Sequence, residues 1–278
     1  MIVTFVICEG PHDAYFVGRL ISQAQGYTVN ENKLSDYPKE ISEFILQRLA
    51  SESADEIRLG KFSNPTIPIC SYLNGENMVL PISVGGMNKV NEAKKLVADI
   101  VDSFNEKVLA VNYSTIKKIR MVFVYDADSR GVEETKRFFE THFLDIFDLA
   151  PENITIDTWI DNARKMPISL FIFREVGRDT GTLEDSLIGI FREQEEELVE
   201  QVRNIIDNRF EALGEHGDAI AYAAKKNKAI LTACGQLEKR NAGSALTVVI
   251  RDTKLLDGVF NSERATPWQS LGDLFSVE

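Results

Sequence analysis

The feature that most constrains the fold is an alternation of short apolar runs with amphipathic stretches over roughly the first 175 residues. Runs that are apolar throughout are typical of strands buried on both faces, and apolar residues at helical spacing indicate helices between them. The expected strands lie at residues 1–8, 78–84, 119–125, 154–160 and 168–173. The expected helices lie at residues 13–25, 38–51, 88–106 and 131–145. This alternation predicts a Rossmann-like α/β fold, a mainly parallel sheet with helices on both faces.

The last third of the chain has a different pattern. Residues 182–213 carry one long acidic helical pattern, residues 217–240 a second and residues 244–257 a shorter third. We therefore expect an α/β core over residues 1–180 and a helical C-terminal extension over residues 181–278. The acidic run EQEEE at 193–197 is interpreted as a solvated helix face.

Charge and composition exclude several classes of protein. The chain has 31 basic and 43 acidic residues, a net charge of −12, and such a surface repels the nucleic acid backbone. This argues against a DNA coat protein, but not against an enzyme whose carboxylates reach a phosphate through divalent cations. The three cysteines have no paired spacing, so neither a disulfide framework nor a zinc site is expected. No run of about 20 apolar residues is present, and a basic signal-peptide segment is also lacking, which predicts a cytoplasmic protein without a membrane span.

Polar residues follow the expected strands at the edge where an open parallel sheet binds its ligands. Acidic residues follow the first and third of these strands, and glycines follow the second. These residues are Glu9 and Asp13, then Gly85 and Gly86, then Asp126 and Asp128. Clustered carboxylates repel each other unless a hard cation neutralises them, which predicts an Mg²⁺ or Mn²⁺ site. The backbone N–H groups of Gly85 and Gly86 are expected to be exposed for an anion.

Three segments resemble the signature segments of the TOPRIM family, which has a strand-end glutamate, a glycine after a second strand and a D-x-D after a third. They are VICEGPHD (6–13), SVGGMNK (83–89) and VFVYDADSRG (122–131). Topoisomerases, bacterial primases, RecR-type repair proteins and OLD-family nucleases share this fold. The nearest resemblance is to small stand-alone OLD-like bacterial proteins of unknown function. A P-loop and zinc-ribbon cysteines are absent, so the chain is not a full-length OLD-type enzyme or a primase.

A fourth segment, GTLEDSL (181–187), resembles the additional acidic segment of OLD-like proteins. The resemblance implies that Thr182 and Glu184 join Glu9 and Asp13 around one cation. It also implies that Asp126 bridges toward a second cation together with Asp128.

The resemblance further implies a lysine from a later helix and a proton-transfer role for the strand-end glutamate. The lysine candidates are Lys225, Lys226 and Lys228, and the glutamate is Glu9. Such a lysine would neutralise charge in the transition state, and the glutamate would act as general acid or base.

The leading hypothesis is therefore Mg²⁺- or Mn²⁺-dependent cleavage of phosphodiester bonds in nucleic acid, with DNA favoured over RNA, in DNA repair or phage defence. A separate ATPase as protein partner and a homodimer stay open. One alternative is a non-catalytic TOPRIM module that binds nucleic acid, nucleotide or a partner protein. Another is a phosphatase of the haloacid dehalogenase type, in which the first aspartate of VFVYDADSRG is the nucleophile.

Overall fold

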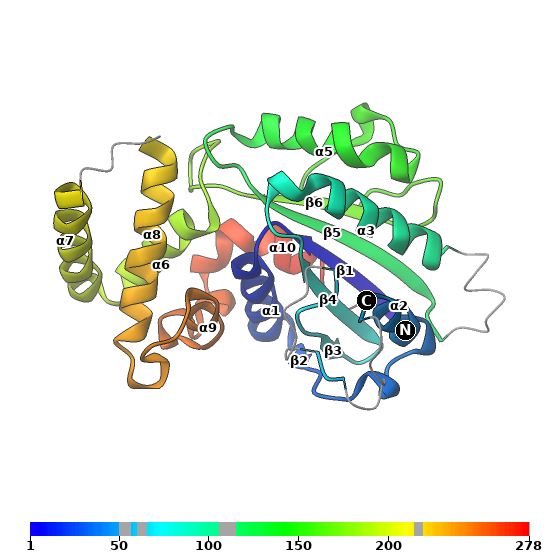
Figure 1. Cartoon of the computed structure of the whole chain (residues 1–278), viewed down its shortest axis with the longest axis horizontal. Helices are drawn as coiled ribbons and strands as arrows, with labels where there is room; N and C mark the ends of the chain where they lie inside the picture. The colour runs from blue at the N-terminus through cyan, green and yellow to red at the C-terminus, as the bar shows by residue number, and fades with distance from the viewer. Residues whose placement is uncertain (50–56, 60–65, 106–114, 214–218, 278) are drawn as a thin grey trace. The chain divides into compact units, whose positions relative to one another are not determined.

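The computed structural model describes residues 1–49, 57–59, 66–105, 115–213 and 219–277. Six strands form one sheet in the order β2-β3-β4-β1-β5-β6 (Figure 1). They are β1 (Ile2–Cys8), β2 (Thr28–Val29), β3 (Tyr72–Asn74), β4 (Asn77–Ser83), β5 (Lys118–Asp126) and β6 (Ile168–Phe173). The central strand β1 is parallel to β4 and β5, whereas β2, β3 and β4 are joined antiparallel at one edge. The prediction of an α/β fold with a mainly parallel sheet is confirmed.

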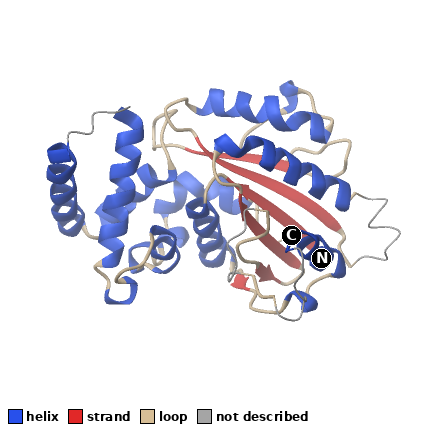
Figure 2. Ribbon diagram, in the orientation of Figure 1, coloured by secondary structure: helices blue, strands red, loops and turns tan. Residues whose placement is uncertain are grey.

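Helices connect the strands and form most of the last third of the chain (Figure 2). In the first part they are α1 (Pro11–Gln25), α2 (Lys39–Leu49), α3 (Val90–Ser103) and α5 (Val132–Phe147). In the last part they are α6 (Leu183–Gln194), α7 (Glu196–Leu213), α8 (Ala219–Gln236), α9 (Leu246–Asp252) and α10 (Gln269–Asp273). In the part of the chain that the structure describes, no helix combines the length and the apolar character that a membrane span requires.

Helices cover both faces of the sheet, as the alternation predicts. On one face, Phe5 of β1 packs against Phe44 of α2 and Phe104 after α3, with ring centroids 5.8 and 5.6 Å away. On the opposite face, Tyr72 of β3 lies so close to Gly18 of α1 that a Cβ at Gly18 would be 1.9 Å from the tyrosine hydroxyl. Side chains of paired residues point to the same side of a sheet, so the register assigns α2 and α3 to one face and α1 to the other.

The chain forms two compact units. The first comprises Met1–Tyr125, Lys136–Phe171 and Ser270–Glu278, and the second comprises Asp126–Thr135 and Ile172–Gln269. The end of the chain belongs to the first unit, where Leu271, Leu274 and Phe275 are buried. The second unit is built mainly from α6, α7, α8 and α9.

Two predicted elements are wrong. Residues 154–160 form no strand but only single bridges, from Ile156 to Leu170 and from Ile160 to Ile168, because the backbone turns at Asp157, whose φ is 64°. The expected single helix over 182–213 is two helices, since the backbone leaves the helical conformation at Glu195, whose ψ is 68°. The ends of three expected helices, at residues 50–51, 106 and 217–218, lie outside the described residues.

The cysteines are buried thiols without a disulfide. Cys8, Cys70 and Cys234 are free, and burial raises the pKa of Cys234 from 9.0 to about 11. A buried thiolate would lose its hydration, so the folded protein keeps the proton at pH values where the unfolded chain releases it.

We expect this difference to make the protein less stable in alkali. Below pH 9 both states hold the thiol proton, and above it the unfolded state ionises first, so stability falls as pH rises from 9.0 toward about 11. Urea unfolding at about pH 8 and about pH 10.5 should show wild type losing ~2 kcal/mol more than Cys234→Ala. Equal losses in the two proteins would contradict the assignment to Cys234.

Candidate functional site

The residue after β1 joins the ends of the neighbouring strands. The Glu9 backbone N–H donates to the Val124 carbonyl at 3.2 Å, and the Glu9 carbonyl accepts the N–H groups of Gly85 and Gly86 at 3.1 and 2.8 Å. Both glycines have a left-handed backbone, with φ of 86° and 92°, which allows the turn after β4 to fold onto Glu9. The prediction that these amides are exposed for an anion is therefore wrong, because Glu9 accepts both of them.

Asp13 lies in the first turn of α1 and is 5% exposed. Its Oδ2 accepts the Gly10 backbone N–H at 2.7 Å, so the carboxylate closes the beginning of the helix that Pro11 starts. It also lies near the Cys8 thiol, whose pKa is raised well above its usual value, first by burial and then by the charge of Asp13.

Glu9 is adjacent to another buried group. The pKa of the Tyr125 hydroxyl is raised, chiefly by burial and next by the negative charge of Glu9. Glu9 and Asp13 thus bring two carboxyl groups to the carboxyl end of β1, one half-buried and one buried.

In the second unit, the D-x-D segment is bonded to the segment that begins α6. The Asp128 N–H donates to the Gly181 carbonyl and the Gly181 N–H to the Asp128 carbonyl, both at 2.9 Å. Asp126 Oδ1 accepts the Leu183 backbone N–H at 2.9 Å. The structure therefore brings Asp126 and Asp128 together with the segment of Thr182 and Glu184, which is distant in sequence.

The beginning of α6 explains how this segment is held. Thr182 precedes the helix and its hydroxyl accepts the Asp185 N–H at 3.3 Å, while the Asp185 carboxylate accepts the Thr182 N–H at 2.8 Å. This reciprocal pair is a capping box. Glu184, in the same first turn, is only 2% exposed. The Glu184 side chain is not a member of this capping box.

Helix α8 distinguishes between the candidate lysines. Lys228 Nζ lies 3.5 Å from Glu184 Oε1, whereas Lys226 Nζ lies 2.5 Å from Asp207 Oδ1. Lys225 is exposed. The adjacent Asn227 donates from Nδ2 to Asp185 Oδ1 at 2.6 Å. The structure thus places Lys228, and not Lys226, beside a predicted metal ligand.

Each of the three predicted carboxylate ligands in the second unit has a donor from the protein. Asp126 accepts the Leu183 amide, Glu184 faces Lys228, and Asp128 Oδ2 lies 3.0 Å from Arg130 Nη2. Carboxylate and hydroxyl oxygens suit a hard cation. Within the described ranges, however, no three His, Cys, Asp or Glu side chains converge so that they could hold a metal ion as they stand.

The six predicted metal ligands are divided between the two units. Glu9 and Asp13 belong to the first, and Asp126, Asp128, Thr182 and Glu184 belong to the second. That residues of the two units bind the same cations stays a prediction.

Two residues near these predicted ligands, Arg130 and Asn227, were not predicted from the sequence. Arg130 stands within the quoted VFVYDADSRG segment as a basic residue two positions after the D-x-D, whereas Asn227 had no signal.

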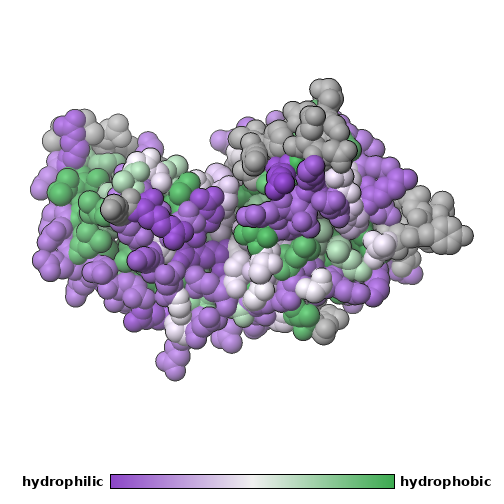
Figure 3. Space-filling model, turned by 90° about the horizontal axis from the view of Figure 1, so that it is seen from below, coloured by the Kyte–Doolittle hydropathy of each residue, from purple (hydrophilic) through white to green (hydrophobic). Residues whose placement is uncertain are grey.

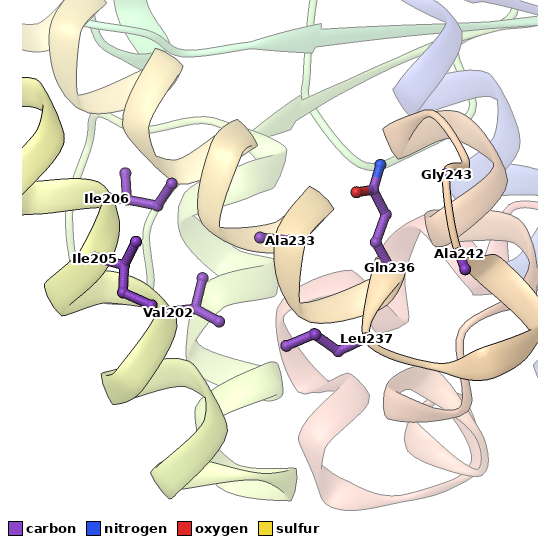
Figure 4. Close-up of a pocket in the computed structure, with 8 residues that line it drawn as sticks. All are labelled: Val202, Ile205, Ile206, Ala233, Gln236, Leu237, Ala242 and Gly243. Carbon is purple, nitrogen blue, oxygen red and sulfur yellow. The ribbon is translucent and has the colours of Figure 1, made fainter.

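The second unit also contains an apolar pocket of about 340 Å³ (Figure 4). Its lining residues are Val202, Ile205, Ile206, Ala233, Gln236, Leu237, Ala242 and Gly243. Ile205 and Leu237 are 67% and 65% exposed. Figure 3 shows hydrophobic residues gathered at the left of the view, the side of α7. The lining includes no charged residue and none of the predicted site residues, so the pocket offers no acid–base or metal chemistry.

Comparison with known proteins supports the fold. No family model matches the chain, and no curated protein matches it. The chain is similar to the crystal structure of a hypothetical protein from Pyrococcus horikoshii OT3, with a TM-score of 0.57 and 15% identity, over 99% of this chain and 96% of that one. At this identity the likeness concerns the arrangement of helices and strands alone.

Proposed function

We propose that the protein cleaves phosphodiester bonds of nucleic acid, DNA in preference to RNA, with Mg²⁺ or Mn²⁺ as cofactor, in the manner of TOPRIM nucleases. The observation that supports this best is the bonding of the D-x-D segment to the beginning of α6, through Asp126 with Leu183 and Asp128 with Gly181. It fixes the backbone of two predicted ligands beside the segment that carries Glu184.

The burial of Glu184 also supports the proposal. Burial of a carboxylate is costly unless it is paired or binds a metal. Thr182, Asp185 and Asp126 already accept the backbone amides at the beginning of α6. One partner of Glu184 in the protein, Lys228, lies 3.5 Å away and is 46% exposed, so a divalent cation would add to the neutralisation of this buried carboxylate.

Each residue has a role in this proposal. The carboxylates of Asp126, Asp128 and Glu184 would hold cations, which lower the pKa of a bound water and neutralise charge on the phosphate. Lys228 would neutralise charge that develops on the departing oxygen. Glu9 keeps its predicted role as proton donor or acceptor, beside Asp13 in the first unit.

The test is a calorimetric titration of Mn²⁺ and Mg²⁺ into wild type and an Asp126→Asn, Asp128→Asn double variant. An asparagine oxygen can still accept the Leu183 N–H, so the variant removes charge and keeps this bond. We expect metal affinity to fall at least about 10-fold, because carboxylate charge dominates binding of hard cations. Cleavage of single-stranded, duplex and supercoiled DNA should disappear with it.

A matched control removes two charges from elsewhere in the second unit. Glu193→Gln with Glu197→Gln changes exposed acids of α6 and α7 and should bind metal and cleave DNA as wild type does. Wild type that binds no divalent cation at millimolar concentration would contradict the proposal.

A non-catalytic module is the second candidate function. It is favoured by the protein donors that Asp126, Asp128 and Glu184 already have. Such a module would bind nucleic acid, nucleotide or a partner protein without any requirement for metal. Binding of oligonucleotide that is unaffected by a chelator would support it.

A further inference from the structure

We propose that the apolar pocket of the second unit is the docking site for an amphipathic helix of a partner protein, with acidic residues at one end of that helix. This inference does not rest on the proposed function, because the lining of the pocket includes none of the predicted site residues.

The two helical sides of the pocket have the residue spacing that packs against another helix (Figure 4). Each side contributes residues at positions i, i+3 and i+4, which lie on one face of a helix. They are Val202, Ile205 and Ile206 of α7, and Ala233 and Gln236 of α8 with Leu237 directly after it. The Leu237 N–H still donates to the Ala233 carbonyl at 3.2 Å. An apolar groove of this kind binds the apolar face of an amphipathic helix.

Two large apolar side chains of the pocket are in contact with water. Ile205 and Leu237 are 67% and 65% exposed, and they come from the two different sides of the pocket. Contact with apolar side chains of a partner would remove both from water, which is favourable. Exposed apolar residues that gather in one place are typical of a surface that binds another protein.

Contacts within the second unit hold the pocket in shape. Gln236 Nε2 donates to the Ser244 carbonyl at 2.6 Å, which keeps the loop at 242–243 beside α8. Beyond the pocket, the rings of Phe210 and Tyr222 join α7 to α8, with centroids 5.3 Å apart. A site that is already formed loses little conformational freedom when its partner binds.

The charge at one end of the pocket indicates the chemistry of the partner. Arg209 is one turn after Ile205 on α7, and Lys225 is about two turns before Ala233 on α8. Both basic side chains are exposed. The ring contact between the two helices places them at the same end of the pocket. Acidic groups of a docked helix would pair with both of them.

The rest of the surface does not favour an acidic partner. The chain has a net charge of −12, and the acidic run at 193–197 lies where α7 begins, away from Arg209 and Lys225. An acidic segment is therefore repelled by most of the protein and attracted at this end of the pocket. This contrast orients the partner helix, with its acidic end beside the two basic residues.

The experiment uses two synthetic peptides of about four helical turns, with leucine at positions i, i+3, i+4 and i+7. One peptide has glutamate in its first turn and the other has glutamine there. In fluorescence anisotropy, wild type should bind the glutamate peptide about 5-fold more tightly, although the net charge of the protein opposes this. A variant with Arg209→Gln and Lys225→Gln should bind the two peptides equally, which completes a double-mutant cycle.

Two further variants test the apolar part of the site. Ile205→Ser with Leu237→Ser should weaken binding of both peptides at least about 10-fold, because these side chains would contact the leucines. Val29→Ser with Val176→Ser is the control, since these valines are 55% and 70% exposed outside the pocket, and it should change neither affinity. Thermal melting of each variant checks that all are folded.

Several outcomes would overturn this inference. Wild type that binds neither peptide, or both with equal affinity, would contradict it, and so would binding that is unchanged by Ile205→Ser with Leu237→Ser. Sedimentation of wild type as a dimer that the same two substitutions dissociate would show that a second copy of the chain occupies the pocket instead. None of these measurements involves metal or DNA, so their failure and that of the proposed function are distinguishable.

Discussion

Replacing Glu184 by glutamine is expected to lower the rate of divalent-cation-dependent DNA cleavage by about 10³-fold, since a metal-held charge stabilises the transition state by several kcal/mol. The free energy of unfolding should stay within about 1 kcal/mol of wild type, the usual range for a replacement of the same shape that leaves no buried charge.

The expected stability follows from the contacts of Glu184. Glutamine has the same shape as glutamate, and the capping box of Thr182 with Asp185 does not involve this side chain. The partner cation Lys228 is 46% exposed and can be hydrated when the carboxylate is gone. Loss of activity without loss of stability is what distinguishes a functional carboxylate from a structural ion pair, whose removal would destabilise the fold.

Cleavage kinetics and urea unfolding of the same preparations provide the measurement. The exposed Glu197 of α7 gives the control, because Glu197→Gln also removes one acid of the second unit and should leave both quantities unchanged. A Glu184→Gln protein that cleaves DNA at the wild-type rate would remove Glu184 from the proposed site.

The second large effect is expected from Gly181→Ala, which should destabilise the protein by about 3 kcal/mol through backbone strain and overpacking together. Gly181 has a φ of 124°, and a Cβ there would lie 2.5 Å from the Glu175 backbone nitrogen. Backbone atoms cannot rotate away as a side chain can. For a chain of this size the melting temperature should fall by about 6–12 °C.

The same substitution should also weaken metal binding. Gly181 exchanges two hydrogen bonds with Asp128 and immediately precedes Thr182, so a shift of this segment separates the D-x-D from the beginning of α6. Calorimetric titration of Mn²⁺ into folded Gly181→Ala, at a temperature well below its melting point, measures this effect.

Gly189→Ala is the matched control for Gly181→Ala. Gly189 lies exposed in the middle of α6, and no atom lies within 4 Å of its ideal Cβ. Alanine favours the helix there and should stabilise the protein by about 0.5–1 kcal/mol. Equal melting temperatures for Gly181→Ala and wild type would show that the segment can shift freely.

Local patterns predicted most elements of the fold. The apolar runs of β1, β4, β5 and β6 are strands because each is long enough to be buried within one sheet. Residues 154–160 have similar apolar residues but form only isolated bridges, since Asp157 adopts a positive φ of 64°. The break between α6 and α7 at Glu195 could not be predicted from the pattern either, because the residues before and after it both have helical spacing.

The alternation of strands and helices follows from periodicity along the chain, and so does the position of Glu9, Asp126 and Asp128 at strand ends. The partners of these residues depend on how the chain packs in three dimensions. This packing brings the Gly85 and Gly86 amides to the Glu9 carbonyl, Lys228 rather than Lys226 to Glu184, and the Leu183 amide to Asp126. The physical reason is that each of these contacts joins residues far apart in sequence, which local spacing does not specify.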